Sequence, residues 1–391
     1  MPLIKQAVIF CGGLGTRLMP LTKKIPKPMV KINREPFLKH LLDQCKSNGI
    51  EDFLFLCGYK HDKIKKYFGN GKKFKVKISY HYNPHYIETY KRIYEARNML
   101  KSKFLLLYAD NYASLNLTDL ALNYNKLKSE FIISICEKKK GNILINKKKN
   151  KISKYYFKKN NKSKYVDIGY MIINKKIIMK NKVNRNFSFN FLIDKLIRQN
   201  KVNFYYNDTG YQSISDLKRY EKTKEYFSSN FILIDRDGVL NLKNDKHYYV
   251  RNLRELKINY SFVEKLKKII KKSKLLCISN QAGISTRDLN KAELNKINKK
   301  IMQELKKFNI NLKEFFICED HFNSNSFNRK PNHGLFLKAA KKYKIILDRT
   351  FYIGDDLRDI EASYRAKTKC MYIGKDNLST NLKRRYINTL I

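Results

Sequence analysis

The chain has 391 residues, 43% of them hydrophobic, and a formal net charge of +49 at pH 7. This length and apolar content allow two or three domains with buried cores, and they exclude a largely disordered chain. The charge would suit a nucleic-acid partner, but Lys far outnumbers Arg. We therefore favour compositional drift together with attraction for small phosphorylated substrates.

The first predicted strand is the apolar run at residues 7–10, and a glycine-rich segment follows it at once. Gly12, Gly13 and Gly15 let backbone N–H groups approach phosphate oxygens, and a strand-to-helix turn adds the positive end of a helix. The continuous run GGLGTRLMPLTKKIPKPM resembles the signature of sugar-1-phosphate nucleotidyltransferases.

The elements that follow predict a parallel α/β sheet. An amphipathic helix at 36–43, a strand at 52–57, a turn and helix at 58–69 and a strand at 75–80 alternate along the chain. The segment 58–69 resembles the turn and helix of family members that act on heptose phosphates. A third apolar strand, at 104–110, ends in Asp110.

The resemblance implies a site and a reaction. Asp110 would hold a catalytic Mg²⁺, and Asp208, in an Asp-x-Gly turn, would be its second ligand. Arg17 would bind the triphosphate, and Lys27 would hold a phosphate. The anomeric phosphate of the sugar would attack the α-phosphorus of a nucleoside triphosphate and release pyrophosphate. The other implied nucleotide and sugar contacts are Gly12, Gly13, Gly15, Thr16 and Gly169.

Two segments depart from the family pattern. Residues 86–93 replace the glycine-rich loop with which many relatives read the base, so the sequence leaves the base open. Residues 137–165 consist mostly of Lys, Asn and Ile. They could form a nucleic-acid patch, but the isoleucines at 143–152 favour a β-hairpin with solvated lysines. Lys158 or Lys159 could hold the sugar phosphate.

A short polar break at 228–230 predicts a boundary between a domain at 1–228 and a second at 229–391. Four apolar residues then lead into Asp235, Arg236, Asp237 and a glycine, as expected for a buried strand that ends in a tight turn. Two carboxylates at the end of a strand make a site for Mg²⁺. The run resembles the first motif of haloacid-dehalogenase-type phosphatases, particularly the branch of histidinol phosphate and heptose bisphosphate.

Three more motifs follow in the order of that family, at 279–284, 328–331 and 351–359. The resemblance implies that Asp235 is the nucleophile and Asp237 the general acid and base. Mg²⁺ would be held by Asp235, Asp237 and Asp355. No long insertion separates the motifs, so we expect no cap domain. The phosphate and substrate contacts implied by the resemblance are Ser279, Asn280, Arg329 and Lys330.

Members of this branch often hold a loop zinc before the Arg-Lys-Pro motif. Cys318 and His321 are present here, but Ser326 and Asn328 stand in place of the two later cysteines. A structural zinc needs four closed ligands, so we do not expect zinc.

These patterns predict two Rossmann-like α/β domains, a nucleotidyltransferase (GT-A-like) with a mixed sheet and a capless phosphatase with a parallel sheet. Together they would dephosphorylate heptose 1,7-bisphosphate and activate the resulting sugar 1-phosphate with an NTP. One alternative keeps both folds but acts on another sugar phosphate or on histidinol phosphate. A more distant one is nucleic-acid end processing, which we do not favour.

The remaining features concern the protein's location. The seven cysteines are scattered and form no Cys-x-x-Cys pair, which is typical of a reducing compartment. The chain opens on a strand-like run rather than a signal peptide, and no apolar run approaches the length that spans a bilayer. We therefore expect a cytoplasmic protein without a membrane partner, and the sequence leaves a homo-oligomer open.

Overall fold

The computed structural model describes residues 4–182, 185–243, 250–270 and 272–374, and beyond these 378, 379, 382, 383, 386, 389 and 390. The chain divides into two compact units, unit 1 at Met1–Glu225 and unit 2 at Tyr226–Ile391. None of the described helices combines the length and the apolar character needed to cross a membrane.

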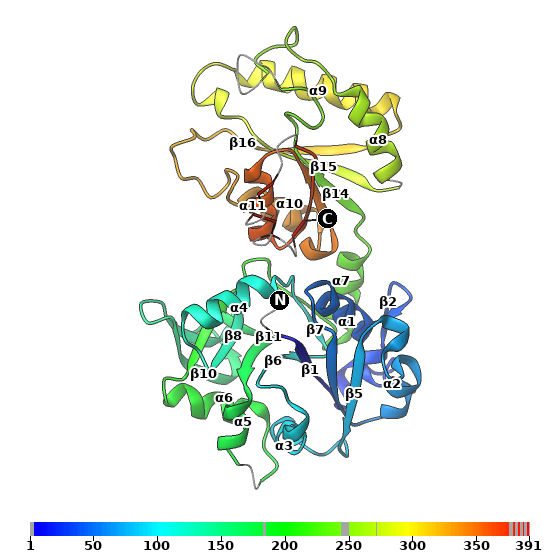
Figure 1. Cartoon of the computed structure of the whole chain (residues 1–391), viewed down its shortest axis with the longest axis vertical. Coiled ribbons are helices and arrows are strands. Elements are labelled where there is room, and N and C mark those ends of the chain that lie inside the picture. Colours follow the sequence, from blue (N-terminus) through cyan, green and yellow to red (C-terminus); the bar gives the residue numbers. More distant parts are fainter. Residues whose placement is uncertain are drawn as a thin grey trace. The chain divides into compact units, whose positions relative to one another are not determined.

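Unit 1 is built on a nine-stranded mixed sheet in the order β5-β4-β1-β6-β11-β8-β12-β10-β9 (Figure 1). The first four strands are parallel, whereas β11 runs antiparallel to both β6 and β8. The strands of this sheet are β1 (Gln6–Cys11), β4 (Asp52–Cys57), β5 (Lys77–Tyr82), β6 (Lys103–Tyr108), β8 (Phe131–Glu137), β9 (Gly141–Asn146), β10 (Lys151–Asn160), β11 (Tyr165–Asn174) and β12 (Val202–Tyr206).

Among the described residues, two short ladders and the helices α1 to α7 accompany this sheet. The ladders pair β2 (Lys31–Ile32) with β3 (Glu35–Pro36) and β7 (Asn111–Tyr112) with β13 (Gln212–Ser213). The helices are α1 (Phe37–Ser47), α2 (His61–Phe68), α3 (Thr89–Glu95), α4 (Leu117–Lys126), α5 (Lys175–Lys180), α6 (Phe189–Arg198) and α7 (Leu217–Phe227), the last of which runs across the division between the units.

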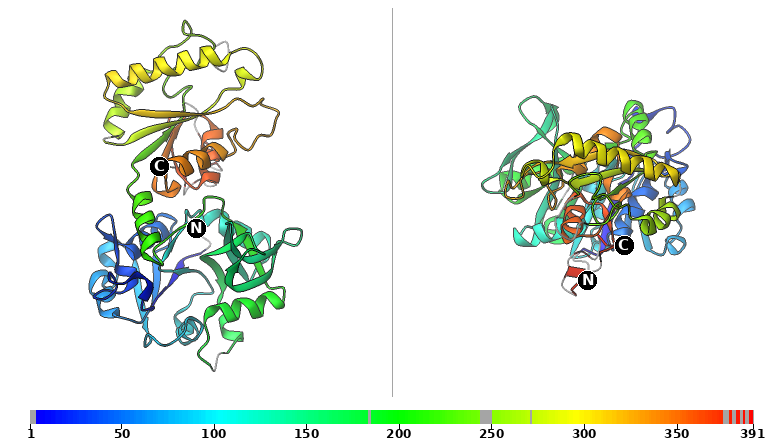
Figure 2. Two further views of the ribbon diagram at one scale, coloured as in Figure 1. Left: turned by 180° about the vertical axis from the view of Figure 1, so that it is seen from behind. Right: turned by 90° about the horizontal axis from the view of Figure 1, so that it is seen from above.

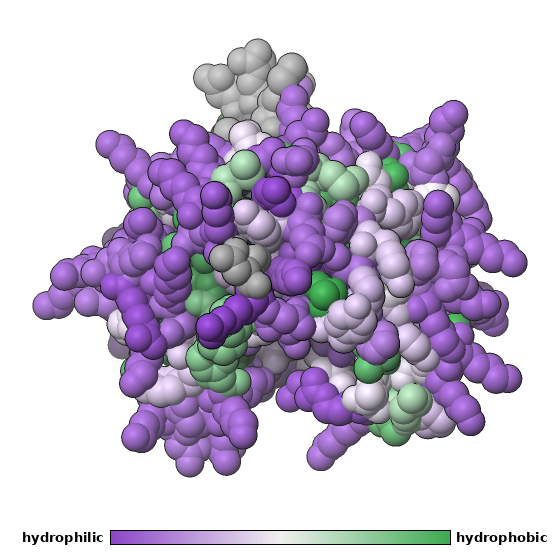
Figure 3. All heavy atoms as spheres, turned by 90° about the horizontal axis from the view of Figure 1, so that it is seen from below, coloured by the Kyte–Doolittle hydropathy of each residue, from purple (hydrophilic) through white to green (hydrophobic). Residues whose placement is uncertain are grey.

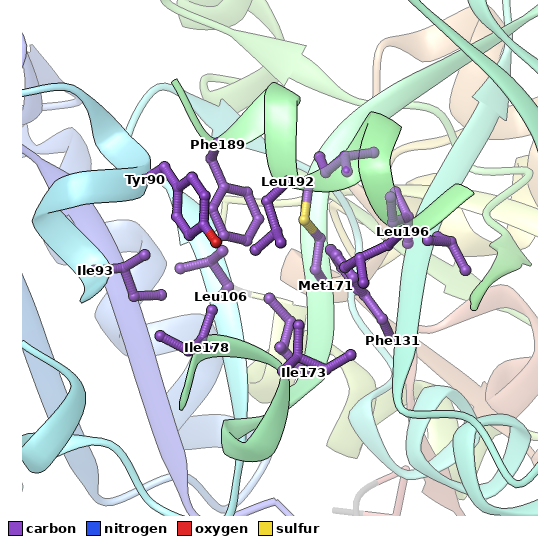
Figure 4. Close-up of a cluster of buried hydrophobic side chains, with 14 of the residues drawn as sticks. Tyr90, Ile93, Leu106, Phe131, Met171, Ile173, Ile178, Phe189, Leu192 and Leu196 are labelled. Atoms are coloured by element: carbon purple, nitrogen blue, oxygen red, sulfur yellow. The ribbon is translucent and has the colours of Figure 1, made fainter. Parts of the chain in front are cut away.

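A large apolar cluster fixes the strands that carry the site residues of unit 1. Phe189, Leu192 and Leu196 of α6 lie against Met171 of β11 and Phe131 of β8 (Figure 4). All five side chains are buried at 1% exposure or less, and each contributes about 1.5–3 kcal/mol by leaving water. This packing holds β11, and the residues that precede Met171 on it, in a fixed register.

The sequence predicted most of these elements and misplaced some of their ends. The β-hairpin expected within 137–165 is confirmed as β9 and β10. The helix predicted at 36–43 continues to Ser47, because its buried stripe extends through Gln44 and Cys45. The strand predicted at 75–80 begins two residues later, at Lys77, because Lys75 adopts a left-handed conformation.

Unit 2 contains a five-stranded sheet in the order β16-β15-β14-β17-β18, in which every pair is parallel. This confirms the expected parallel α/β fold. Its strands are β14 (Phe231–Ile234), β15 (Lys274–Asn280), β16 (Leu312–Cys318), β17 (Phe351–Gly354) and β18 (Lys369–Tyr372). Its helices after α7 are α8 (Tyr260–Ile270), α9 (Lys291–Lys307), α10 (Gly334–Tyr343) and α11 (Leu357–Ala366).

These helices cover the two faces of the sheet in unit 2. Helices α8 and α9 lie on one face and α10 and α11 on the other, as the left view of Figure 2 shows. Successive residues of β14 therefore point into different cores, Ile232 and Ile234 into the first and Leu233 into the second. A strand covered on both faces must be apolar along its whole length.

Hydrophilic side chains cover most of the molecular face in Figure 3, and hydrophobic ones form separate patches on it. The chain carries 83 Lys and Arg against 34 Asp and Glu. An excess of this size makes the whole surface attractive to anions, without by itself marking a site.

Candidate active sites

The first candidate site lies where β1 and β6 of unit 1 end beside each other. Phe10 and Tyr108 are partners in this parallel ladder, so Gly12 and Asp110, each two residues further on, leave the sheet at the same level. Both line a cavity of about 260 Å³. Ligands of α/β proteins bind at this edge of the sheet, so the cavity is a candidate nucleotide site.

Lys27 reaches the same cavity from a short 3-10 helix, Lys27–Met29. Its Nζ lies 2.5 Å from Asp110 Oδ2, in an ion pair partly shielded from water. Gly13 also lines the cavity. The structure therefore brings together Gly12, Gly13, Lys27 and Asp110, four residues that the resemblance implied for one site.

The rest of the glycine-rich loop lies outside the lining of this cavity. Gly15 has a φ of +68°, which a residue with a side chain rarely adopts, and its carbonyl accepts a hydrogen bond of 2.9 Å from Thr22 Oγ1. Thr16 and Arg17 are exposed at the start of the helix that follows. Their contacts with a nucleotide stay predictions.

A buried arginine lies beneath the glycine-rich loop. The Arg92 guanidinium donates hydrogen bonds to the carbonyl groups of Cys57 and Ile87 and to two further carbonyls at residues 83–84. A Cβ at Gly12 would lie 2.5 Å from Arg92 Cζ, and one at Gly58 would lie 2.9 Å from Nη1. The two glycines leave the space that this cation fills. The sequence alone gave Arg92 no role, although the arginine stands within the segment 86–93 that departs from the family pattern.

A second cavity of about 300 Å³ adjoins the first, because Thr89, Tyr108 and Asp110 line both. Gly169 lines it with a φ of +80°, and a Cβ there would lie 2.8 Å from Tyr108 Cδ2. The remaining lining is rich in groups that bind hydroxyls and phosphates, namely Asn142, Tyr155, Lys159, Asp167, Ser188, Asn190, Tyr211, Ser213, Ser215 and Arg219.

Asp110, Asp167, Lys159 and Arg219 give this second cavity its charges. Burial raises the pKa of Asp167 to about 7, although its carboxylate accepts a hydrogen bond of 2.7 Å from the Gly169 N–H. Burial, together with the nearby Arg219, lowers the pKa of Lys159. Of the two lysines considered from sequence, Lys159 lines the cavity and Lys158 is not among its lining residues.

The place of Asp208 relative to the two cavities differs from that of Asp110. Ser213, the ladder partner of Asn111, lines the second cavity together with Asp110. Asp208 follows β12 and is not among the lining residues of either cavity. Its role as the second Mg²⁺ ligand beside Asp110 stays a prediction.

The candidate site of unit 2 centres on a buried lysine. Lys330 Nζ lies 2.8 Å from Asp235 Oδ2 and 2.8 Å from Asp359 Oδ1, and it donates a hydrogen bond of 2.7 Å to the Tyr352 hydroxyl. Burial raises the pKa of Asp235 to about 7 against the opposing effect of Lys330. The lysine thus balances two carboxylates that the fold removes from water.

Asp237 points away from this lysine into a network of its own. Arg236, which is fully buried, contacts both of its carboxylate oxygens at 3.1 Å. Gln281 Nε2 donates to Oδ2 at 2.6 Å and Asn241 Nδ2 to Oδ1 at 2.9 Å. Sequence reasoning had given Arg236 and Gln281 no role. The sequence contains two signs of these roles. Arg236 stands between the two acids, and Gln281 is an amide within the second motif, at 279–284.

The second motif of unit 2, at 279–284, also holds the backbone of the third, at 328–331. Asn280 donates to the carbonyl of Lys330 and accepts from its N–H, both at 3.0 Å. Ser279 is buried and its Oγ accepts from Gln281 Nε2 at 3.0 Å. Asn280 therefore positions the backbone of the lysine loop, and its predicted phosphate contact stays a prediction.

Oxygens of Asp235, Asp355 and Asp359 lie within 4.8 Å of one another. Asp355 Oδ1 is buried and has no hydrogen-bond partner among the described residues, whereas Oδ2 pairs with Lys243 at 2.6 Å. A Cβ at Gly238 would collide with this carboxylate. Carboxylates around an unsatisfied buried oxygen fit Mg²⁺, which Asp235 and Asp355 would hold. The Asp237 carboxylate is not part of this cluster.

The loop before the lysine closes around Asp320. Its Oδ2 accepts hydrogen bonds from Cys318 Sγ at 3.4 Å and from Ser326 Oγ at 2.5 Å. Arg329 Nη1 donates to the Asp320 carbonyl at 3.4 Å, and His321 Nδ1 accepts from a loop N–H. The Asp320 carboxylate thus links the two ends of the loop in which the sequence raised the question of a zinc site.

Comparison with known proteins separates the two units. The sequence model of a family described as nucleotidyl transferase matches residues 6–210, and that of polynucleotide kinase 3 phosphatase matches residues 230–375.

Three similar proteins all match the first unit. A D-glycero-α-D-manno-heptose 1-phosphate guanylyltransferase of Campylobacter jejuni is 37% identical over 122 residues, which is 31% of this chain and 55% of the relative. A glucose-1-phosphate cytidylyltransferase of Salmonella typhimurium is 51% identical over 65 residues, or 17% of this chain and 25% of the relative. The structure of HddC from Yersinia pseudotuberculosis with GMP-PN has a TM-score of 0.51 at 26% identity, and the match covers 57% of this chain and all of that one. The chain spans about half the length or less of these two curated relatives.

Proposed function

The chain belongs to the nucleotidyl transferase family, and we propose that it is a bifunctional enzyme of nucleotide-activated heptose biosynthesis. Unit 2 removes the 7-phosphate of a heptose 1,7-bisphosphate, and unit 1 transfers a nucleotidyl group to the resulting heptose 1-phosphate. The observation that carries the proposal is that each unit contains a separate cluster of charged residues suited to binding phosphate. In unit 2 this is Lys330 with its two carboxylates, and in unit 1 it is Asp110, which lines two adjoining cavities.

In the phosphatase reaction, Asp235 attacks phosphorus and the P–O bond to the sugar breaks. The leaving oxygen takes a proton from Asp237, which later removes one from the water that hydrolyses the aspartyl-phosphate. Lys330 holds Asp235 in place and offsets phosphate charge, and Arg236 fixes the orientation of Asp237. Bound Mg²⁺ would supply further charge neutralisation at Asp235 and Asp355.

In the transferase reaction, the nucleotide occupies the cavity along Gly12 and Gly13, and the sugar phosphate occupies the one that Gly169 lines. Asp110 lies at the wall that both share. A phosphate oxygen of the sugar forms the new bond to the α-phosphorus, and pyrophosphate leaves. Positioning and charge neutralisation, from Lys27 among others, account for most of the acceleration in such transfers.

The base is proposed from the relatives. The names of two similar proteins refer to a guanylyl group or to GMP-PN, so GTP is the first choice. A third relative is a cytidylyltransferase, which makes CTP the alternative. The same folds could also serve another sugar phosphate or histidinol phosphate.

The test supplies the protein with heptose 1,7-bisphosphate, Mg²⁺ and each of the four NTPs in turn. We expect phosphate release with every NTP and a nucleotide–sugar with one of them. No phosphate release would refute the phosphatase assignment, and release without any nucleotide–sugar would refute the coupling. Asp110→Ala should release phosphate from the bisphosphate but make no nucleotide–sugar. Asp235→Asn should release no phosphate from the bisphosphate but should still make the nucleotide–sugar when heptose 1-phosphate is supplied, so each variant is the control for the other.

A second function is favoured by one observation, the match of unit 2 to a family described as a 3-phosphatase of polynucleotides. The net charge of +49 would attract DNA. An oligonucleotide with a 3′-phosphate discriminates the two. Release of that phosphate at a higher kcat/KM than from heptose 1,7-bisphosphate, with steeply salt-dependent binding, would replace the sugar-phosphate proposal for unit 2.

A further inference from the structure

A further cavity of unit 1 has no part in the reactions proposed above. It has a volume of about 660 Å³ and is lined by residues of α6, of the loop before this helix and of α3. Cavities that bind small molecules have volumes of roughly 300–1,000 Å³. This one shares no lining residue with either of the cavities at Asp110, so its ligand would be a separate one.

Helical spacing collects four of the lining residues on the outer face of α6. The opposite face of the helix lies in the apolar core, where Phe189 and Leu196 are buried (Figure 4). Residues at i, i+3, i+4 and i+7 share one face of a helix. The lining residues with this spacing are Phe191, Asp194, Lys195 and Arg198. Because the core holds one face of α6, the direction of the other is fixed.

Three aromatic rings meet at this outer face and are exposed there. The ring centroid of Phe191 lies 4.8 Å from that of Phe187 and 5.0 Å from that of Phe157 on β10. Phe191 is 49% exposed and Phe157 is 52% exposed. Single apolar side chains on a surface are ordinary, but adjacent ones mark a binding surface. Aromatic rings offer flat faces on which a nucleic base can stack.

The charges of the cavity select an anionic ligand. The one acid of the lining, Asp194, is already paired with Arg198 at 2.8 Å. Lys182, Arg185 and Lys195 line the cavity as well and have no carboxylate partner among the described residues. Cations gathered without a partner attract an anion. A second copy of this chain, with its net charge of +49, would meet them with charge of the same sign.

Hydrogen bonds between segments hold the walls of the cavity in place. The Tyr90 N–H donates to the Phe187 carbonyl at 3.1 Å, and the Tyr90 hydroxyl donates to the Asn181 carbonyl at 2.5 Å. The Asn186 side chain accepts a hydrogen bond of 2.7 Å from the Glu88 N–H. Sites for small ligands are usually formed before the ligand arrives, which reduces the ordering that binding requires. The walls of this cavity meet that condition.

From this arrangement we infer that the cavity is a further ligand site, which takes a nucleoside polyphosphate. The base stacks on the exposed rings of Phe187 and Phe191, and the amide of Gln199, which also lines the cavity, contacts its polar edge. Lys195 and the two other unpaired cations hold the phosphates. An inorganic anion would leave the rings unused, and an apolar ligand would leave the cations unused. The inference goes beyond the function proposed for unit 1 and does not rest on it.

The test places a fluorescent reporter in the cavity. The chain contains no tryptophan, so Phe191→Trp introduces a single indole, whose emission reports on stacking at this site alone. Titration of this variant with GDP should quench the emission in a saturable way. Leu122→Trp is the matched control, because Leu122 lies on α4 and is exposed to the same extent, 50% against 49% for Phe191. The emission of this control should show no saturable change.

Charge reversal tests the contact with the phosphates. Added to Phe191→Trp, Lys195→Glu should weaken GDP binding roughly 10- to 100-fold, as expected for losing a hydrogen bond between charged groups. Lys201→Glu makes the same change of charge at an exposed lysine just beyond α6 that does not line the cavity. It should bind GDP as Phe191→Trp alone does. Calorimetry without the reporter gives a second reading, in which Lys195→Glu should bind one GDP fewer per chain than the wild type.

Four results would overturn the inference. The first is an emission of Phe191→Trp that does not saturate with GDP, and the second is an equal loss of affinity in Lys195→Glu and Lys201→Glu. The third is pyrophosphate that displaces GDP at equal concentration, which would reduce the site to one for anions. The fourth is a thymidine oligonucleotide that binds more tightly than GDP, which would assign the cavity to a nucleic-acid strand.

Discussion

Replacing Asp167 by Asn should stabilise unit 1 at high pH. Burial raises the pKa of Asp167 to about 7 in the folded protein, against about 3.9 for an Asp in an unfolded chain. Between these values the folded state keeps a proton that the unfolded state has released. Stability is therefore greatest below about pH 4 and is lost as the pH rises to about 7.

The magnitude follows from about 1.4 kcal/mol for each unit of difference between the folded and unfolded pKa. At pH 8 the whole difference of about 3 between the two pKa values lowers the free energy of unfolding by roughly 4 kcal/mol. At pH 5 it lowers this free energy by roughly 1.5 kcal/mol. Asn does not titrate, so the gain from Asp167→Asn should be larger at pH 8 than at pH 5 by at most about 2.5 kcal/mol. Because water enters the cavity and screens the charge, we expect about 1–2 kcal/mol.

Urea unfolding of the wild type, Asp167→Asn and Asp43→Asn at pH 5 and pH 8 measures this difference. Tyr155 and Lys159 line the same cavity and are present in all three proteins, so their own titration cancels. Asp43→Asn should show no comparable dependence on pH, since its carboxylate is exposed and paired with Lys39. An equal effect of Asp167→Asn at both pH values, or a larger gain at pH 5, would refute the reasoning.

Three further predictions concern unit 2. Lys330→Met leaves Asp235 and Asp359 buried without their cation. It should lower the free energy of unfolding by about 3–5 kcal/mol and abolish phosphate release. A variant with the thermal stability of the wild type would contradict the predicted loss of stability. Gly238→Ala places a Cβ against the Asp355 carboxylate at a φ of +86°; a colorimetric phosphate assay should show loss of activity while nucleotidyl transfer persists. EDTA should stop phosphate release and added Mg²⁺ restore it; full activity after exhaustive chelation would exclude a metal at Asp235 and Asp355.

Much of both candidate sites could be predicted from sequence, because the residues concerned follow apolar strands directly. Asp110 and Asp235 each come at the end of such a run, and parallel strands gather their carboxyl ends at one edge of a sheet. The resemblance to two families implies that Lys27 shares a site with Asp110 and Lys330 one with Asp235, and the structure has both pairs in contact. The two folds could be inferred for the same reason, since a strand covered on both faces must be apolar throughout.

Other residues were placed only by the tertiary structure. The buried Arg92 fits beneath Gly12 because Cys57, at the end of a strand distant in sequence, supplies one of its carbonyl partners. Ser213 enters the second cavity because two short strands pair it with Asn111. Neither partnership follows a spacing that the sequence displays.

Asp167 shows most clearly the difference between what the sequence determines and what the tertiary structure decides. Its identity and its strand can be read from the sequence, but an Asp two residues before a glycine is an ordinary pattern. Its carboxylate lines the cavity only because β11 shifts register there against β8 while its apolar residues stay packed under α6. The sequence determined which chemistry each unit carries, through residues fixed to strand ends. The fold decided which side chains from other strands complete each cavity, because register and side-chain direction depend on packing between segments far apart in the chain.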